Sequence, residues 1–249
     1  MDREEGYQNI QGNTNHYEDD GLDVIEYEND RDLINMPWRG SKNQYLIELV
    51  LLATGMGFVL GSAVSLLGLA AAIQNATISS GCLYGAFSLT CIPSPLIVTK
   101  IGPKWGLFLG TMLYVAYAVG TIFHEILWLY IISSICGGVG STILWTSQGA
   151  YLTTIAEAHA LSTNKQKAES LGLFNGVFVA IFQTGLLFCV LLSSLVLPIG
   201  QGDDTEPLKR QEDILYVVYA GICALSAFLV FLLPTHHALF SKKERKETT

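Results

Sequence analysis

Charge is scarce in this chain for its length. Only 14% of its 249 residues are charged, whereas an average soluble domain carries roughly 25%. Half of the residues are hydrophobic, and this combination excludes a single soluble globule. Lysine and arginine are especially few, 14 against 22 acidic residues, and they form no basic patch. The sequence therefore also excludes a nucleic-acid-binding protein.

Patterns that carry catalysis or bind metals are also missing. The five cysteines fall in apolar stretches without a CxxC or Cys/His spacing, which argues against a disulfide framework and a zinc site. No Ser-His-Asp, HExxH, paired-carboxylate or Walker pattern is present, and Gly138-Val139-Gly140 lacks the third glycine of a dinucleotide loop. We therefore expect no enzyme activity, no catalytic residue, no metal and no cofactor.

The charge that the chain does have is concentrated near its beginning. Residues 1–42 contain 11 acidic and 4 basic side chains, few aliphatic ones and no helix or strand periodicity. Such a segment cannot bury enough apolar surface to become ordered, so we predict a disordered acidic tail. Within it, Tyr7-Gln8-Asn9-Ile10 fits a pattern read by clathrin adaptors and a phosphotyrosine pattern read by SH2 domains. Tyr7 is a candidate for sorting or phosphorylation, or a chance match.

Long apolar runs occupy most of the remaining chain. Windows of about 19 residues, the length suited to a membrane-spanning helix, give six segments: 45–73, 79–98, 105–123, 126–154, 171–197 and 214–233. Each is long enough to cross a bilayer as a helix. The sequence predicts an all-α integral membrane domain over residues 43–235 and a basic tail over residues 236–249. No signal-peptide pattern is visible, so insertion is expected to use the first span.

Basic residues set the predicted orientation. Lysines and arginines lie before the first segment, between the second and third, between the fourth and fifth, and after the sixth. The opposite side holds only Lys209 and Arg210, so the positive-inside rule places both termini in the cytosol. The one N-x-[ST] sequon, at Asn75, then falls on the lumenal or extracellular side, where glycosylation is permitted. Plasma membrane and endosomal membrane fit this topology equally well.

Small residues recur at every fourth position in several segments. Such rows allow helix backbones to approach closely, and packing within one bundle is favoured over a dimerisation face. The glycines predicted to serve this packing are Gly57, Gly61, Gly102, Gly106, Gly110, Gly137, Gly172 and Gly176.

Polar side chains within the segments gather in the fourth and fifth. Neutral groups there can bond across helices or contact a ligand, and Gln148 and Gln183 could satisfy each other. Ionisable residues such as Glu48 and His159 lie near predicted helix ends, where solvation or snorkelling is expected, and no proton relay is visible in mid-span. For Glu48 the alternative is an ion pair at a cytosolic gate. The candidates for client or solute binding are Trp145, Thr146, Gln148, Tyr151, Asn175 and Gln183.

Six spans with both ends in the cytosol resemble one half of a major facilitator superfamily transporter. In that superfamily the loop between the second and third spans carries a Gly-x-x-x-Asp-Arg-x-Gly-Arg-Lys pattern, which aligns with the ten residues that end at Lys104. Lys100, Gly102 and Lys104 match, and Pro103 lies among them, whereas Thr99 replaces the acid. The resemblance implies that Lys100, Gly102, Pro103 and Lys104 belong to a gating loop. This loop lacks the interaction that the acid makes in the superfamily.

Two runs carry a more specific likeness. LWTSQGAYLT, which starts at Leu144, and IGPKW, which starts at Ile101, closely resemble the uncoordinated-ninety-three family of facilitator-like membrane proteins. The likeness covers about residues 45–234. Members of that family are regulatory partners of potassium channels or trafficking chaperones of endosomal receptors, and others are orphan transporters. The resemblance implies a non-enzymatic regulator or trafficking partner of an ion channel, of potassium-channel type, or of a receptor.

Two other functions stay open at this point. One is a facilitative solute transporter with Trp145, Gln148, Asn175 and Gln183 along a neutral polar path. The other is a half without independent activity, because full-length family members have two six-span halves and this chain has one, which favours a truncated product. Its expected partners are the lipid bilayer, a channel or receptor client, and a second six-helix half or a second copy of the chain.

Overall fold

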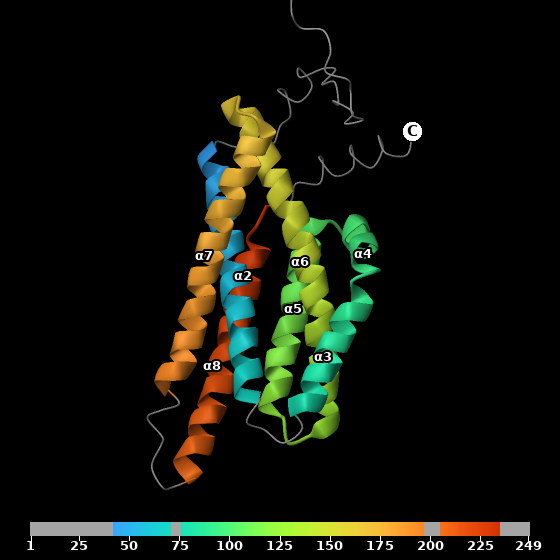
Figure 1. Cartoon of the computed structure of the whole chain (residues 1–249), viewed down its shortest axis with the longest axis vertical. Coiled ribbons are helices and arrows are strands. Elements are labelled where there is room, and N and C mark those ends of the chain that lie inside the picture. Colours follow the sequence, from blue (N-terminus) through green and yellow to red (C-terminus); the bar gives the residue numbers. More distant parts are fainter. Residues whose placement is uncertain (1–41, 71–75, 197–204, 235–249) are drawn as a thin grey trace, which may run out of the picture. The chain divides into compact units, whose positions relative to one another are not determined.

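The computed structural model describes residues 42–70, 76–196 and 205–234, and the regular structure in these ranges is helical. Seven helices are described (Figure 1): α2 Lys42–Ala70, α3 Ala76–Thr90, α4 Ser94–Ile101, α5 Pro103–Ile122, α6 Leu127–Thr163, α7 Lys167–Val196 and α8 Thr205–Phe231. Tyr7, Asn75 and the two predicted tails lie outside the described residues, apart from Lys42 at the start of α2, so the expectations for them stay predictions.

Five of the six predicted spans correspond to single long helices. Helices α2, α5, α6, α7 and α8 are each long and apolar enough to cross a bilayer, and α3 with α4 would make a sixth span if the two count as one. Helix α6 has 37 residues, which at about 1.5 Å per residue is longer than the ~30 Å hydrocarbon core. The helix continues beyond the predicted end at residue 154 to Thr163 and is longer than a span perpendicular to the membrane needs.

The prediction of one continuous helix over residues 79–98 is wrong. Helices α3 and α4 meet at an angle of 67°. Pro93 is the N-cap of α4, and a second proline, Pro95, lies in its first turn. Proline has no backbone N–H and disfavours the helical conformation in the residue before it, so α3 ends and a new helix begins. Average hydropathy over a window does not register this break.

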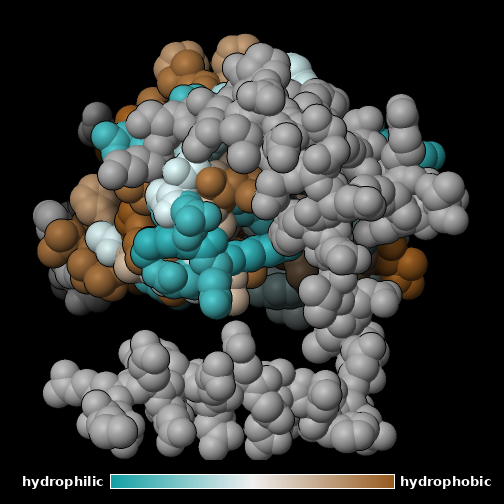
Figure 2. Space-filling model, turned by 90° about the horizontal axis from the view of Figure 1, so that it is seen from above, coloured by the Kyte–Doolittle hydropathy of each residue, from teal (hydrophilic) through white to brown (hydrophobic). Residues whose placement is uncertain are grey.

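Apolar side chains cover the flanks of the described bundle. Several large ones are strongly exposed, including Leu89 at 78%, Ile92 at 84% and Trp128 at 78%. Figure 2, seen from above, shows hydrophilic side chains gathered at the upper end of the described helices and hydrophobic ones around them. This distribution is what a bilayer requires, because lipid tails favour apolar side chains and water favours polar ones at the helix ends.

Glycines allow close helix contacts at several predicted positions. A Cβ added to Gly57 of α2 would lie 2.9 Å from the carbonyl oxygen of Phe182 in α7. One added to Gly110 of α5 would lie 2.9 Å from the Cβ of Leu144 in α6. Both distances are below normal contact, so only glycine fits without a shift of the neighbouring helix. Close neighbours also meet Gly61, Gly106 and Gly137.

Two of the predicted packing glycines do not pack in this way. A Cβ at Gly172 or Gly176 of α7 would meet no atom within 4 Å, so these positions face open space in the described structure. Gly102 serves a turn instead, because its φ of 88° joins α4 to α5 in a conformation that side-chain-bearing residues rarely adopt. The four-residue spacing is the same in every case and does not say which face of a helix is covered.

Tyr219 links α8 to α7 in the interior of the bundle. Its ring is fully buried, its hydroxyl donates to the carbonyl oxygen of Cys189 at 2.7 Å, and it also bonds the hydroxyl of Ser193. We expect Tyr219→Phe to lower the free energy of unfolding by about 1–2 kcal/mol, because buried polar partners are left without their bond. Thermal unfolding of purified protein in detergent measures this effect. The control is Tyr84→Phe, at a 56% exposed tyrosine of α3; equal losses would contradict the prediction.

Candidate functional site

A short stretch of α6 that begins at Trp145 contacts several neighbouring helices. The Thr146 hydroxyl lies 2.8 Å from the hydroxyl of Ser94 in α4. The ring of Trp145 meets Phe182 of α7 edge to face, with centroids 5.7 Å apart. Two turns further on, Tyr151 reaches α2. These predicted candidates therefore hold α2, α4, α6 and α7 together, whatever else they bind.

The three amide side chains among the candidates are not brought together. Gln148 is buried, at 7% exposed. Asn175 and Gln183 are exposed on α7, so the structure does not pair Gln148 with Gln183. The side chain of Trp145 in α6 is 41% exposed. The neutral polar groups are thus split between the interior and the outer surface of the bundle.

Glu48 takes part in a buried polar contact that sequence reasoning missed. The Tyr151 hydroxyl donates toward Glu48 Oε2 at 3.4 Å and toward the carbonyl oxygen of Pro234 at 3.2 Å. Glu48 is 2% exposed and Tyr151 is 1% exposed. The contact joins α2, α6 and the residue that follows the last turn of α8. The expectation of a solvated or snorkelling Glu48 is therefore wrong.

The sequence did contain a signal for the burial of Glu48. Tyr45, Leu49 and Leu52 are all buried, and spacings of three and four residues place them with Glu48 on one helix face. A carboxyl group on the buried face of an apolar helix needs polar partners. The hydroxyl of Tyr151 could have been suggested as a donor to Glu48, but only the tertiary structure shows that the two side chains meet.

A second buried polar group lies where α6 and α7 meet. His159 is 6% exposed, its Nδ1 lies 3.3 Å from the Ser170 hydroxyl, and its ring is 5.0 Å from that of Phe174. The expectation that His159 is solvated is also wrong. Next to it Lys167 pairs with Glu157 at 2.5 Å. Side chains that the sequence placed at a water-exposed end instead fix the junction of the two helices.

The predicted gating loop is a tight turn between α4 and α5. Gly102 donates its N–H to the Val98 carbonyl at 2.8 Å, and α5 begins at Pro103. The Lys104 ammonium lies 5.7 Å from the ring centroids of both Trp105 and Phe231. Cation–π attraction of this kind ties the start of α5 to the end of α8. Lys100, in the last turn of α4, is exposed.

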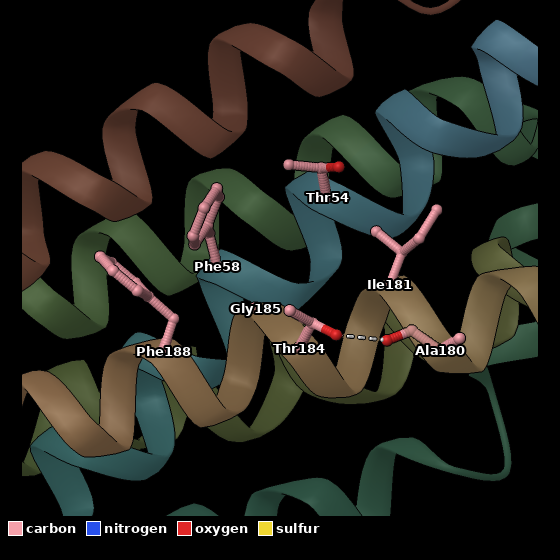
Figure 3. A pocket seen from close by; sticks show the side chains of 7 residues that line it. All are labelled: Thr54, Phe58, Ala180, Ile181, Thr184, Gly185 and Phe188. Carbon is pink, nitrogen blue, oxygen red and sulfur yellow. Dashed lines mark hydrogen bonds between the residues drawn. The ribbon is translucent and has the colours of Figure 1, made fainter.

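A groove of about 460 Å³ lies between α2 and α7 (Figure 3). Phe58 and Phe188 meet edge to face at one end, with centroids 6.1 Å apart. The Thr184 hydroxyl donates to the carbonyl oxygen of Ala180 on its own helix at 2.8 Å. The other lining residues are Thr54, Ile181 and Gly185. The groove is apolar, and the Thr184 hydroxyl is already bonded, so it suits apolar groups.

The helices and their connections define a class of protein: a multi-pass helical membrane protein with the fold of one half of a major facilitator superfamily transporter. The chain resembles the crystal structure of a variant of the E. coli fucose:proton symporter FucP, with a TM-score of 0.56 and 19% sequence identity. The match covers 77% of this chain and 50% of that chain. At this identity the likeness shows the fold alone, and it confirms the predicted fold class.

Residues 73–249 match the family described as ion channel regulatory protein UNC-93, and the chain belongs to this family. It is 30% identical to UNC93-like protein 3 of Arabidopsis thaliana over 158 residues, which are 63% of this chain and 33% of that protein. It is 34% identical to protein unc-93 homolog A of Bos taurus over 116 residues, 46% of this chain and 25% of the relative. The matches thus span a third or less of these relatives.

Proposed function

We propose that this protein is a non-enzymatic, multi-pass membrane regulator or trafficking partner of an ion channel, of potassium-channel type, or of a receptor. The observation that carries the proposal is membership of the ion channel regulatory family over residues 73–249. The relatives are proteins of the same family in plants and animals. We further propose that both termini lie in the cytosol of a plasma or endosomal membrane, with Tyr7 available for sorting contacts and Asn75 on the opposite side.

The distribution of charge supports a regulator over an ion-coupled transporter. In the described helices the acidic, basic and histidine side chains lie toward helix ends, as Glu48 and His159 do. Coupling to a proton or cation gradient normally uses ionisable groups within the span. Thr99, which replaces the loop acid of the superfamily pattern, bonds the Leu96 carbonyl of its own helix at 3.0 Å. A regulator needs neither of these groups.

Facilitated transport of a neutral solute is the competing function. It is supported by Gln148, whose amide side chain is buried in α6. A buried amide costs free energy unless it is hydrogen-bonded, and a neutral solute is one group that can supply such a bond. Thr146 and Tyr151 flank Gln148 on α6, whereas Asn175 and Gln183 lie on the exposed surface of α7.

Co-expression separates the two functions. Cells expressing one defined potassium channel at a time are recorded with and without this chain, and surface channel is measured by biotinylation. We expect a change in current or surface level of at least about twofold for a client channel, while vesicles reconstituted with the chain alone show no saturable uptake.

Gln148→Ala is the discriminating variant, with Thr153→Ala on the same helix as its control. If Gln148→Ala abolishes uptake of a solute and leaves every channel unchanged, the transporter is correct and the regulator is not. If the chain changes no channel current and the intact chain shows saturable uptake of a solute, the transporter is again correct and the regulator is not.

A further inference from the structure

A lysine and three aromatic rings meet where α5 begins and α8 ends. The Lys104 ammonium lies 5.7 Å from the ring centroids of both Trp105 and Phe231. Phe108 joins the two rings, with its centroid 6.1 Å from that of Trp105 and 5.7 Å from that of Phe231. We call Lys104, Trp105, Phe108 and Phe231 the Lys104 cluster. Because each ring contacts another and the lysine lies against two of them, the position of the ammonium is well defined.

The Lys104 cluster lies at the boundary of the bilayer. Helix α5 has 20 residues, which at about 1.5 Å per residue matches the ~30 Å hydrocarbon core. Lys104 and Trp105 belong to its first turn, so they lie near the level of the lipid headgroups. Tryptophan is enriched at this depth because its ring is apolar and its N–H is polar. The lysine is therefore within reach of lipid phosphate groups.

The surface next to the cluster has the composition of a lipid contact. The exposed residues of α5 are all apolar and are Trp105, Leu109, Met112, Ala116 and Val119. Their spacing of three and four residues places them on one helix face. Over residues 214–231 of α8 no exposed residue has a polar side chain. The open faces of α3 and α7 differ, because they expose Ser88, Asn175 and Gln183.

The charge of Lys104 is not neutralised by an acidic side chain in the described part of the chain. The ion pairs there are Lys165–Glu169 and Lys167–Glu157, whereas the Lys104 ammonium contacts the two rings. Cation–π attraction orients an ammonium but does not neutralise it, and its three hydrogens can still be donated to an oxygen acceptor. An anion at the membrane boundary would complete the site.

We propose that the Lys104 cluster binds an anionic phospholipid. The Lys104 ammonium contacts the lipid phosphate, the glycerol lies against Trp105 and Phe231, and an acyl chain follows the face of α5 past Leu109 and Met112. One ammonium fits a lipid with a single negative charge, such as phosphatidylserine, because polyphosphorylated headgroups require clusters of roughly four to eight basic residues. If both termini are cytosolic, as proposed, the site lies in the cytosolic leaflet, which holds the anionic lipids.

A lipid fits this surface better than a protein helix does. Close contacts between membrane helices use small residues, but near the cluster α5 exposes the large side chains of Trp105, Leu109 and Met112. Flexible acyl chains can fill the uneven surface between such side chains. The described exposed faces of α5 and α8 also hold no amide or hydroxyl side chain that needs a protein partner.

Lipid binding by the purified full chain tests the site. Native mass spectrometry in detergent counts the phosphatidylserine and phosphatidylcholine molecules that stay bound. We expect phosphatidylserine to be retained about tenfold better, because the choline cation offsets the phosphate charge in phosphatidylcholine. Lys104→Gln should remove this preference, whereas Lys104→Arg should keep it because the cation remains.

Lys100→Gln is the matched control for Lys104→Gln. Lys100 lies in the last turn of α4, is exposed, and takes no part in the cation–π contacts of the described residues. The substitution removes the same charge from the same end of the bundle. If the site is the Lys104 cluster and not general attraction to a basic surface, most of the preference for phosphatidylserine should remain.

Phe231→Leu tests the aromatic part of the site. Leucine keeps an apolar side chain at the end of α8 but removes one of the two rings that orient the ammonium. We expect retention of phosphatidylserine to fall by about threefold. The control is Phe228→Leu, one turn earlier on α8, at a 57% exposed residue outside the ring contacts of the cluster, and it should not change retention.

Three results would overturn the proposal: equal retention of the two lipids, equal losses from Lys100→Gln and Lys104→Gln, or equal losses from the two phenylalanine variants. If Lys104→Gln leaves lipid binding unchanged but releases a co-purifying protein, an acidic protein group occupies the site and the lipid proposal is wrong. Binding in detergent depends neither on the orientation of the chain nor on its client, so a failure of either leaves the site intact.

Discussion

Gly138→Ala is expected to destabilise the bundle more than any other single methyl addition on α6. The new Cβ would overlap the Leu83 carbonyl oxygen of α3 and lie 2.9 Å from both the Ala86 Cβ and the Phe87 amide nitrogen. Two of these three atoms belong to the backbone, which cannot rotate away, so α3 must shift as a unit. The shift would also weaken the 3.1 Å bond from the Thr142 hydroxyl to the Phe87 carbonyl.

Overpacking of this kind costs about 1–3 kcal/mol, and more when rigid groups must move. We expect the melting temperature of the purified protein in detergent to fall by about 5 °C. The yield of monodisperse protein should fall with it. Scanning fluorimetry and size-exclusion chromatography measure both quantities.

Gly221→Ala in α8 is the matched control for this substitution. A Cβ at Gly221 meets no atom within 4 Å, so the change adds only the helix propensity of alanine, about 1 kcal/mol in its favour. The melting temperature should be unchanged or slightly higher. If both variants lose the same stability, the close approach of α6 to α3 is not the cause.

Glu48→Ala is expected to have the second large effect. It removes the buried side chain that accepts from Tyr151 at 3.4 Å, so the polar contact between α2 and α6 is lost, whereas the bond from Tyr151 to the Pro234 carbonyl remains. The lost hydrogen bond contributes about 0.5–1.5 kcal/mol and the cavity left by the buried side chain adds to it, so we expect a loss of about 2 kcal/mol. Glu48→Gln keeps the shape and an acceptor oxygen and should lose less than half as much. Thermal unfolding measures each variant.

Two controls show whether the contact itself is responsible. Glu125→Ala removes an exposed glutamate from the connection between α5 and α6 and should change the melting temperature little. Tyr151→Phe combined with Glu48→Ala should cost less than the sum of the two single losses, because both remove the same bond. Additive losses in this cycle would mean that Tyr151 and Glu48 act independently.

The prediction of the helices from hydropathy failed at one place, where proline ends a helix locally. Hydropathy located the long helices because a bilayer requires about 20 apolar residues for each span. It did not locate the break at Pro93, because two prolines in a short stretch hardly change the average. The prolines themselves were visible, so local rules applied before the averaging would have found the bend of 67°.

The glycines show a different kind of limit. Gly57, Gly110 and Gly172 all belong to four-residue rows, yet the first two meet a neighbouring helix and Gly172 meets open space. Gly138, which has closer backbone neighbours than Gly137, was not among the predicted packing residues. Spacing says that a row of small residues lies along one side of a helix. It does not say which side another helix covers.

The candidate site was also predicted only in part, because the polarity of a residue does not say which side of its helix another helix covers. Trp145, Thr146 and Tyr151 do contact other helices, and their polarity in an apolar segment made them visible. Gln148 and Gln183 share that polarity, but one is buried and the other lies on the outer surface. Glu48 was read from its nearness to a helix end, although its burial depends on α6 and α8.

The sequence by itself determined that this protein is helical, lies in a membrane and belongs with the facilitator-like UNC-93 proteins. Hydropathy and composition suffice for the first two because lipid imposes them on every spanning segment. Only the tertiary structure decided which polar groups are buried, where the second span bends, and that α3 and α7 are left open. Those facts depend on contacts between residues far apart in the chain, such as Glu48 and Tyr151, and no local pattern specifies them.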